Sequence, residues 1–408
     1  MATPISLVNF NSVQKKQEEK KLFNYFKSKF FRLFAVLFLC MALPSLAGAF
    51  GTIKVDDDKW FKIGAGIRSS FSTSNSATGT ATGSATDFAL DNMRVYTLTK
   101  VHKNIVFEFN TEVRETNERT TDLNAKDRHD IFVLDAVAKF SIKGFDVWAG
   151  KFLPPSDRSN LNGPYFLNVY DFPVVQNYPA IAAGRDLGVA IMKEYGGGKF
   201  KWSYGMFEGR TAATNSDTSP DDTDNLLHAA RFTYNFWTPE PGYYTTSSYY
   251  GAKDVLALAF VYQYESDGAG TGTTGTTQGD FTGWNLDLLM EKKLSNGGVV
   301  NLEGAYYDYD TDDIADGTLI QGDGYLALAS YLLPNPIGWG KFQPYVRYQH
   351  FDRELGAARG TRSVTEGGFN YIIDGHNAKM MVFYSGDKNG SNAATVDTFK
   401  IGMQFQLL

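Results

Sequence analysis

The side chains of this sequence that could do chemistry are charged residues at alternate positions rather than a catalytic constellation. Gly66, Arg68 and Ser70 are spaced two residues apart, and Glu108 and Glu112 also fall at even spacing. Fixed charges that face water attract or repel ions, so these positions could line a path for ions. Both signs of charge occur, which predicts weak ion selectivity. For any single arginine, the alternative to a role in ion passage is that it solvates the barrel wall or forms an ion pair between strands. The cations at such positions are Lys62, Arg68, Arg114, Lys139, Lys201, Arg231, Arg347 and Lys400, and the carboxylates are Glu108, Glu112, Asp135, Asp287, Glu291 and Glu303.

Enzymatic chemistry has little support in the sequence. The five histidines are scattered, and no nucleophile elbow or Ser–His–Asp pattern is discernible. A hydrolase would need a base beside its nucleophile, a role for which His228 and His350 are the candidates. The acidic runs 56–58, 221–222 and 308–313 resemble cation-binding clusters, but the last lacks the glycine and distal glutamate of an EF-hand loop. We therefore expect no enzyme, no metal and no cofactor.

The composition excludes several classes of protein. The chain has 408 residues, of which 15% are aromatic and 40 are glycine, and its formal charge of −6 argues against general nucleic-acid binding. A single cysteine excludes a disulfide framework and a cysteine-based zinc site. After residue 50 the longest apolar run is Val255–Tyr262, far short of the 18 or so residues of a membrane-spanning helix.

The first 49 residues are predicted to be an export signal. Seven Lys and Arg residues precede an apolar core, Leu33–Leu43, and Ala47 and Ala49 form a small-residue cleavage site before Phe50. The alternatives are a membrane anchor, for which the core is too short, and a lipoprotein modified at Cys40. The segment carries +5, so residues 50–408, the predicted mature domain, carry −11.

The mature chain alternates apolar and polar residues almost throughout. In 60–73, Phe61, Ile63 and Ile67 share one parity, whereas Lys62 and Arg68 share the other. Successive side chains of a strand point to opposite faces, so the pattern predicts strands with one apolar and one polar face. The same alternation occurs in 105–114, 131–142, 199–208, 284–291 and the last strand, 399–406.

The connections between these strands alternate in length. Short turns, such as 143–144 and 374–377, alternate with long polar loops, such as 116–130 and 211–225. Seven short links and eight long ones predict sixteen strands. The link 238–253 is counted as a short-side connection, although it is long for a turn and could contain another hairpin.

Sixteen strands predict a transmembrane β-barrel rather than a soluble one. A closed barrel of this size leaves an aqueous channel, so the polar parity must face water and the apolar parity lipid. Closure also satisfies every backbone hydrogen bond in the membrane. Tryptophans such as Trp148 and the run 243–250 are predicted to form aromatic bands at the strand ends. The fold class is therefore all-β, a 16-stranded antiparallel transmembrane barrel with short periplasmic turns and long extracellular loops.

The C-terminal strand has the form of an outer-membrane assembly signal. Lys400, Gly402, Phe405 and Leu407 fit the pattern polar-x-Gly-x-x-aromatic-x-hydrophobic, which the barrel assembly machinery reads. Leu408 departs from the pattern, because an aromatic residue usually ends such a chain.

Five stretches in order resemble the phosphate-selective porin O and P family of Gram-negative bacteria. They are 147–154, 184–189, 229–234, 342–348 and 368–377. The resemblance implies a sixteen-stranded outer-membrane porin, commonly a homotrimer, whose third extracellular loop folds inward and narrows the pore. Phosphate specificity is not carried over, because the polar face mixes both signs of charge.

The loop in question would be residues 154–185, the longest in the chain. Long loops of this kind are usually functional, and its aromatic and proline content favours a packed plug over a solvated surface loop. Its candidate constriction residues are Asp157, Arg158 and Asp171, with Lys151 at the entry and Arg185 at the exit.

The function expected from these features is passive diffusion of small hydrophilic solutes or ions, with anions such as phosphate among the candidates. The expected partners are the lipid bilayer, lipopolysaccharide, the assembly machinery and two further copies of the chain, and no nucleic acid. The principal alternative is a barrel that sheaths a multihaem cytochrome at the periplasmic or outer surface. Since the chain has no Cys-x-x-Cys-His motif, the haem would belong to that partner. An adhesin is a third option.

Overall fold

The computed structural model describes most of the predicted mature chain. The described residues are 51–75, 84–115, 129–177, 184–210, 225–270, 278–314, 320–355, 360–391 and 393–407. The predicted signal segment 1–49 and the tips of several long loops lie outside these residues, as does the side chain of Arg114.

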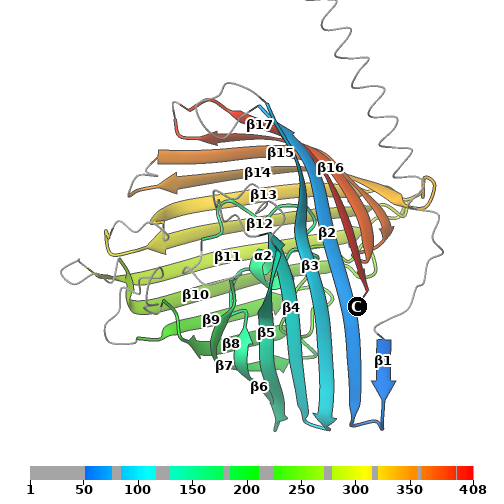
Figure 1. Cartoon of the computed structure of the whole chain (residues 1–408), viewed down its shortest axis with the longest axis vertical. Helices are drawn as coiled ribbons and strands as arrows, with labels where there is room; N and C mark the ends of the chain where they lie inside the picture. Colours follow the sequence, from blue (N-terminus) through cyan, green and yellow to red (C-terminus); the bar gives the residue numbers. More distant parts are fainter. Residues whose placement is uncertain are drawn as a thin grey trace, which may run out of the picture. The chain divides into compact units, whose positions relative to one another are not determined.

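Sixteen strands form a closed antiparallel barrel, as predicted (Figure 1). Each strand pairs with the next along the chain, and β17 pairs with β2, where Gly402 lies opposite Ser70. The strands are β2 (Trp60–Ser74), β3 (Ala85–His102), β4 (Ile105–Glu115), β5 (His129–Ile142), β6 (Phe145–Phe152), β7 (Asp186–Tyr195), β8 (Phe200–Phe207), β9 (Leu227–Asn235), β10 (Val255–Ala269), β11 (Gly279–Lys293), β12 (Val299–Asp310), β13 (Gly322–Leu332), β14 (Lys341–Arg353), β15 (Gly360–Asp374), β16 (Ala378–Asn389) and β17 (Val396–Leu407).

A short additional strand, β1 (Gly51–Lys54), was not predicted. It pairs with β2 along the same edge that β17 uses, with Gly51 opposite Ile63 and Leu407 opposite Ala65. The beginning of the mature chain therefore continues the line of the last strand. Its backbone groups pair with the end of β2 that β17 leaves bare.

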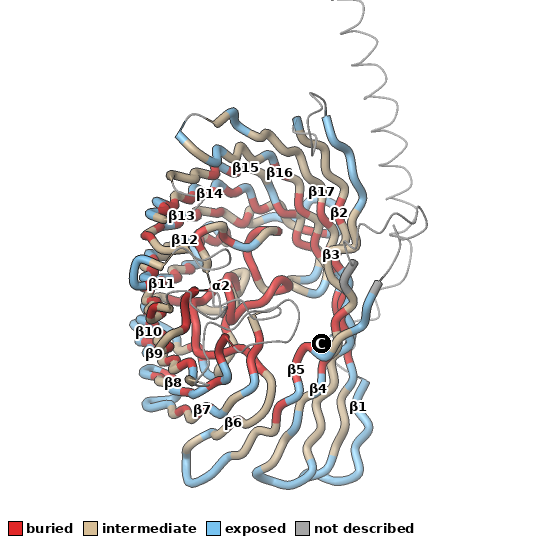
Figure 2. Tube along the Cα trace, turned by 60° about the vertical axis from the view of Figure 1, so that its left-hand side comes forward, coloured by how far each residue is buried: buried red, intermediate tan, exposed pale blue. Residues whose placement is uncertain are grey.

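The burial pattern confirms the predicted parity on most strands. On β2, Ile63 and Ile67 are 45% and 42% exposed, whereas Arg68, on the opposite face of the strand, is 4% exposed and points inward. On β11, Leu286 is 40% exposed and Asp287 is 3% exposed. Apolar side chains thus cover the outside, where lipid would lie, and polar ones line the inside. Figure 2 shows buried and exposed positions alternating along the strands.

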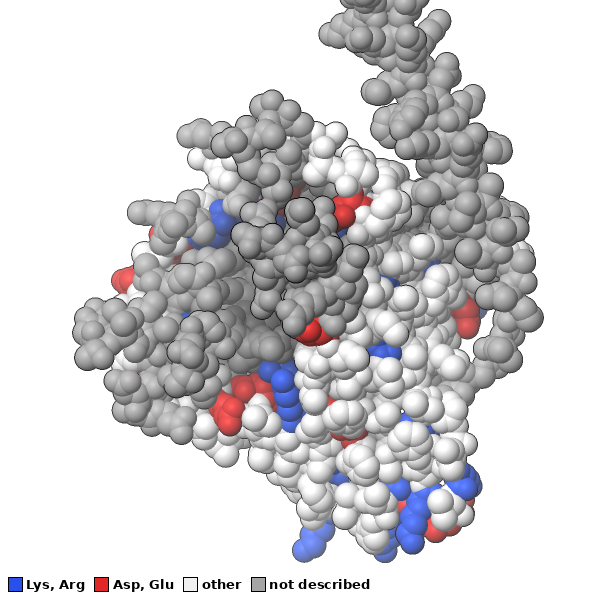
Figure 3. Space-filling view, in the orientation of Figure 1, with Lys and Arg blue, Asp and Glu red and all other residues white. Residues whose placement is uncertain are grey.

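The outer face seen in Figure 3 is largely uncharged, and charged side chains gather at its lower edge near β1. Ion pairs join Lys54 to Asp57 and Lys100 to Asp58 there. Charge at the edge and little charge on the wall are the distribution expected of a membrane barrel.

One strand departs from the predicted parity because of a β-bulge. On β5, Asp135 lies opposite Asn110 while Val133 lies opposite Thr111, so Leu134 has no partner of its own. An extra residue reverses the alternation on one side of a bulge. Leu134 is buried on the inner side, whereas the prediction placed it on the apolar outer face.

The connections confirm short turns at one end and long loops at the other, with one correction. The link between β9 and β10, residues 236–254, contains no further hairpin and is not a simple turn. It leaves the wall and enters the barrel. Among the described residues, α2 (Arg158–Asn162) is the one α-helix, and no helix there is long and apolar enough to cross a membrane.

Candidate functional site

Two chain segments enter the barrel from opposite ends and meet inside it. The loop segment, residues 153–177, follows β6 at the long-loop end, and the turn segment, residues 236–254, links β9 to β10 at the short-turn end. They are joined directly, because the backbone N–H of Ser247 donates to the carbonyl oxygen of Phe166 at 3.0 Å. Figure 2 shows buried chain around α2 within the wall. The lumen therefore contains two segments of the chain itself.

The loop segment is built around the short helix α2. Asp157 caps its N-terminus, and its carboxylate accepts from the backbone N–H groups of Ser159 and Asn160 at 2.9 and 3.3 Å. This carboxylate also accepts from the side-chain amide of Gln176 and from the hydroxyl of Tyr307 on β12. Asp157, a candidate constriction residue, thus serves to hold the helix in place.

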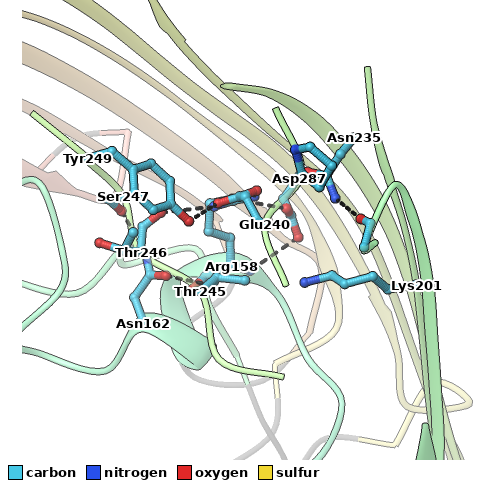
Figure 4. A network of polar contacts seen from close by, with 12 residues as sticks. Arg158, Asn162, Lys201, Asn235, Glu240, Thr245, Thr246, Ser247, Tyr249 and Asp287 are labelled. Carbon is cyan, nitrogen blue, oxygen red and sulfur yellow. Dashed lines mark hydrogen bonds and ion pairs between the residues drawn. The ribbon is translucent and has the colours of Figure 1, made fainter. Parts of the chain in front are cut away.

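Arg158, the first residue of α2, joins the two segments by a forked ion pair (Figure 4). Its Nη1 and Nη2 donate to Oε1 and Oε2 of Glu240 at 2.9 and 2.6 Å, and both side chains are buried. Burial alone would raise the pKa of Glu240, but the charge and hydrogen bonds of Arg158 lower it to about 2. Both groups therefore remain charged and bound to each other.

Asp287 on β11 ties this pair to the wall. It accepts from the backbone N–H of Arg158 at 3.1 Å and from Nη2 of Arg231 on β9 at 3.0 Å. Arg231 also donates to the carbonyl oxygen of Ser156 at 2.9 Å. The predicted wall cation and the predicted loop cation are thus parts of one network.

The other half of the loop segment rests on two glycines of the wall. A Cβ on Gly66 of β2 would lie 2.8 Å from the ring of Tyr165, and one on Gly402 of β17 would lie 2.3 Å from the ring of Tyr170. The guanidinium of Arg68 lies 4.0 Å from the centre of the Tyr170 ring and donates to that residue's carbonyl oxygen. Gly402, which lies in the predicted assembly signal, therefore has a packing role.

Two further wall cations hold the loop segment at Asp171. Lys400 on β17 donates to both oxygens of its carboxylate at 2.8 and 3.0 Å. Arg347 on β14 donates to its carbonyl oxygen at 2.8 Å and forms an ion pair with Glu366 at 2.6 Å.

The turn segment is held mainly by wall carboxylates. Glu291 on β11 accepts from the hydroxyl of Ser248 and from the backbone N–H groups of Tyr249 and Gly251, at 2.8 to 2.9 Å. Glu303 on β12 accepts from the hydroxyl of Ser247 at 2.9 Å. The inward acidic residues found in the sequence thus bind the backbone and hydroxyls of a segment that enters the barrel.

His376, in the turn between β15 and β16, contacts both inward segments. Its Nε2 lies 2.9 Å from the hydroxyl of Thr246 and 2.9 Å from the carbonyl oxygen of Ser248. Its ring packs 5.1 Å from Phe166 of the loop segment. Burial, assisted by the charge of Lys379, lowers the pKa of His376 to about 3, so the ring is neutral over the ordinary pH range.

Between these segments and strands β3–β5 lies a cavity of about 590 Å³, called the chamber below. Tyr96, Asn110 and Asp135 line it from the wall, Tyr165 from the loop segment and Tyr244 from the turn segment. On the opposite side the segments are bonded to β11–β17, so the chamber is the space they leave against the remaining wall.

The charges that line the chamber are paired. Arg94 on β3 binds Glu112 on β4, with Nε and Nη2 at 3.0 and 2.8 Å from Oε2. Arg185, at the end of the predicted constriction loop, binds Asp135 with Nε at 3.2 Å from Oδ1. Arg94 was not among the candidate residues, although its position two residues before Tyr96 on an alternating strand would have indicated it.

Most of the predicted site residues come together, but two predictions need correction. Lys151 lies on the outer face of the wall rather than in the lumen. It is directly opposite Leu187 on β7, which is exposed, and residues directly opposite on neighbouring strands share a face. Trp148 and the tyrosines at 243–244 point into the lumen, where their rings pack 4.9 to 5.6 Å apart, rather than forming an interfacial band. The entry of residues 236–254 was missed, although its length for a turn was a signal.

Comparison with known proteins agrees with this architecture. Residues 309–407 match the family model described as Phosphate-selective porin O and P. A curated relative, an uncharacterized protein of Aquifex aeolicus (strain VF5), is 29% identical over 159 residues, which span 37% of this chain and 36% of that relative.

Two solved structures show the same fold. The outer membrane channel DcaP of Acinetobacter baumannii has a TM-score of 0.54 at 11% identity, covering 87% of this chain and 99% of that one. The in-vitro folded OmpT of Vibrio cholerae, an outer membrane protein in its trimer form, has a TM-score of 0.51 at 13% identity, covering 86% and 100%. Residues 309–407 are thus similar to the phosphate-selective porin O and P family, and the closed sixteen-stranded wall has the fold of outer-membrane barrels of known structure.

Proposed function

We propose that the protein is a passive channel for small hydrophilic solutes or ions across the outer membrane. The observation that carries the proposal is a polar inner wall whose lumen holds two inward segments and a chamber beside them. Barrels of sixteen strands are wide enough for an aqueous path, and inward segments narrow it to the size of small solutes.

The pairing of the lumen charges supports weak ion selectivity. Anion selectivity needs fixed positive charge that a passing anion can approach. In the described part of the lumen, Arg94, Arg158 and Arg231 each bind a carboxylate, as do Arg185, Arg347 and Lys400. Phosphate is therefore one candidate solute among several, despite the name of the family.

The contents of the lumen favour a channel over a cytochrome sheath. A multihaem partner threaded through the barrel would have to displace both inward segments. These are fastened by buried ion pairs and by hydrogen bonds, such as the one from Lys379 to the carbonyl oxygen of Leu167 at 2.7 Å.

The same proposal includes the assembly and surroundings of the barrel. An N-terminal signal of residues 1–49 would direct export, and the assembly machinery would read Phe405 and Leu407, which face outward on β17. We further propose a homotrimer in contact with lipopolysaccharide, with no enzymatic activity; the trimer form of the similar OmpT structure supports the oligomeric state.

Reconstitution in a planar bilayer tests the channel. We expect stepwise current increments and, under a salt gradient, a reversal potential that shows only a small preference for either sign. The same preparation unfolded by heat is the control. Folded barrels that insert but give no current steps would refute the proposed function, and a strong anion preference would refute weak selectivity.

A further inference from the structure

We propose that the chamber binds uncharged, hydroxyl-bearing ring solutes of the sugar class, and that these are preferred cargo of the channel. The inference rests on the proposed function and adds the class of solute. It is drawn from the side chains that line the chamber on β3–β5 and on the two inward segments.

The first argument is electrostatic. The two arginines of the chamber, Arg94 and Arg185, are both less than a tenth exposed, and each is bound to a carboxylate. An anion such as phosphate would have to share these guanidiniums with the carboxylates already bound to them, whose negative charge repels it, or separate a buried ion pair. The two arginines therefore present paired charge rather than a free cation to the chamber. An uncharged solute can bind there without separating an ion pair.

The second argument is the presence of aromatic rings on three sides. Tyr96 and Tyr165 pack edge to face with their centres 6.2 Å apart, and Tyr244 and Phe166 line the chamber from the turn and loop segments. A tyrosine offers an apolar face and a polar edge. A sugar ring has the same two characters, a C–H face that packs on aromatic rings and hydroxyls at its rim.

The third argument is the polar groups between these rings. Asn110 on β4, Asn162 on α2 and Thr246 on the turn segment line the same chamber and provide amides and a hydroxyl. Their N–H and O–H groups already donate within the protein, for example from Asn110 to Asp135 and from Asn162 to Ser247. What they offer a solute hydroxyl is therefore the remaining acceptor capacity of their oxygens. The volume of about 590 Å³ lies in the range of small-molecule sites.

The experiment is block of the ion current through the reconstituted full chain. Glucose, maltose, inorganic phosphate and glycine are added in turn at constant conductivity. We expect the two sugars to reduce the current in a saturable way, and phosphate and the zwitterionic glycine to do so only at much higher concentration. Stronger block by phosphate or glycine than by either sugar would overturn the proposal.

A ring substitution tests the chamber itself. Tyr96→Ala should raise the maltose concentration for half-block roughly three- to tenfold, the usual worth of one aromatic contact. Tyr325→Ala is the matched control, since Tyr325 faces outward on β13, and it should leave the block unchanged. If Tyr96→Ala does not assemble, the comparison of solutes on the unaltered chain still decides the proposal.

A charge substitution tests the electrostatic argument. Glu112→Gln removes the partner of Arg94, so phosphate block should appear and the reversal potential should move toward anions. Asp254→Asn makes the same change in charge at an exposed ion pair with Lys292, at the short-turn end of the barrel. It should neither create phosphate block nor move the reversal potential. Current without sugar block would overturn this inference and leave the channel intact, whereas absence of any current would overturn the channel.

Discussion

Arg68, Arg231 and Arg347 each donate to a backbone carbonyl oxygen of the loop segment, at Tyr170, Ser156 and Asp171. These wall cations therefore position the loop segment as well as contribute charge to the lumen. A guanidinium can do both because it carries five donors in a fixed fork. Substitutions at these positions should affect the shape of the lumen more strongly than its ion selectivity.

Removal of the Arg158 side chain should loosen both inward segments. Arg158→Met leaves Glu240 and Asp287 buried without their shared guanidinium, and loss of one partner of such a pair typically costs about 3–5 kcal/mol. We expect faster cleavage of the turn segment by added protease and noisier current, with the barrel still formed. Lys292→Met, at an exposed pair, is the control and should change neither. Equal protease resistance of Arg158→Met and the unaltered chain would contradict this role.

Gly402 offers a smaller test of the same packing. Gly402→Ala places a methyl group 2.3 Å from the Tyr170 ring, so the ring must move and the conductance of single channels should change. Gly304→Ala on β12 is the matched control, because its nearest contact would be at 3.8 Å. Unchanged conductance of the Gly402 variant, at normal barrel yield, would show that Tyr170 does not narrow the path.

At the scale of elements, the two inward segments depend on each other. The loop segment is fastened chiefly by wall cations, and the turn segment chiefly by the wall carboxylates Glu291 and Glu303. Arg158 with Glu240 and the ring of His376 join them. The constriction is therefore a two-part structure whose halves should move together.

Acid should loosen this structure. The pKa of His376 is about 3 in the docked state, compared with an ordinary value of 6.5. As the pH falls from 6.5 toward 3, an undocked state therefore binds a proton that the docked state does not bind, and undocking is favoured. Glu240 adds to the effect, because its stabilisation is complete above pH 4.5 and is lost as the pH falls toward 2. Current fluctuations should therefore increase between pH 7 and pH 4.

The variant His376→Asn should weaken this pH response, since asparagine keeps a hydrogen-bonding side chain but does not titrate. The measurement is the open-channel noise of reconstituted protein across the same pH range. A flat response of the unaltered chain would show that docking of the segments is not linked to these two groups.

At the scale of the whole molecule, the barrel needs an apolar outer face. Leu286→Arg introduces a charge on that face, and at mid-membrane such a change costs roughly 2–4 kcal/mol. We expect a lower yield of folded barrel, measured by heat-modifiable migration on gels, whereas Leu286→Met should assemble normally. Normal assembly of the arginine variant would mean that this face does not contact lipid.

The alternation of residues by itself determined the strands, their number and, on most strands, their inner and outer faces. This information is local, because a strand of period two shows its two faces in any ten residues. The last strand was predictable for the same reason, whereas the assembly signal within it stays a prediction. Where an extra residue entered, as at Leu134, the local pattern gave the wrong face, since a bulge depends on the partner strand.

Only the tertiary structure decided how the lumen is filled. Arg158 and Glu240 are 82 residues apart in the sequence, and Lys400 and Asp171 are 229 apart, so no local pattern could pair them. The entry of residues 236–254 into the barrel likewise depends on carboxylates of β11 and β12 that the chain reaches only afterwards. A closed wall brings distant strands around one common space, and the partners that meet in that space are set by the closure rather than by the order of the residues.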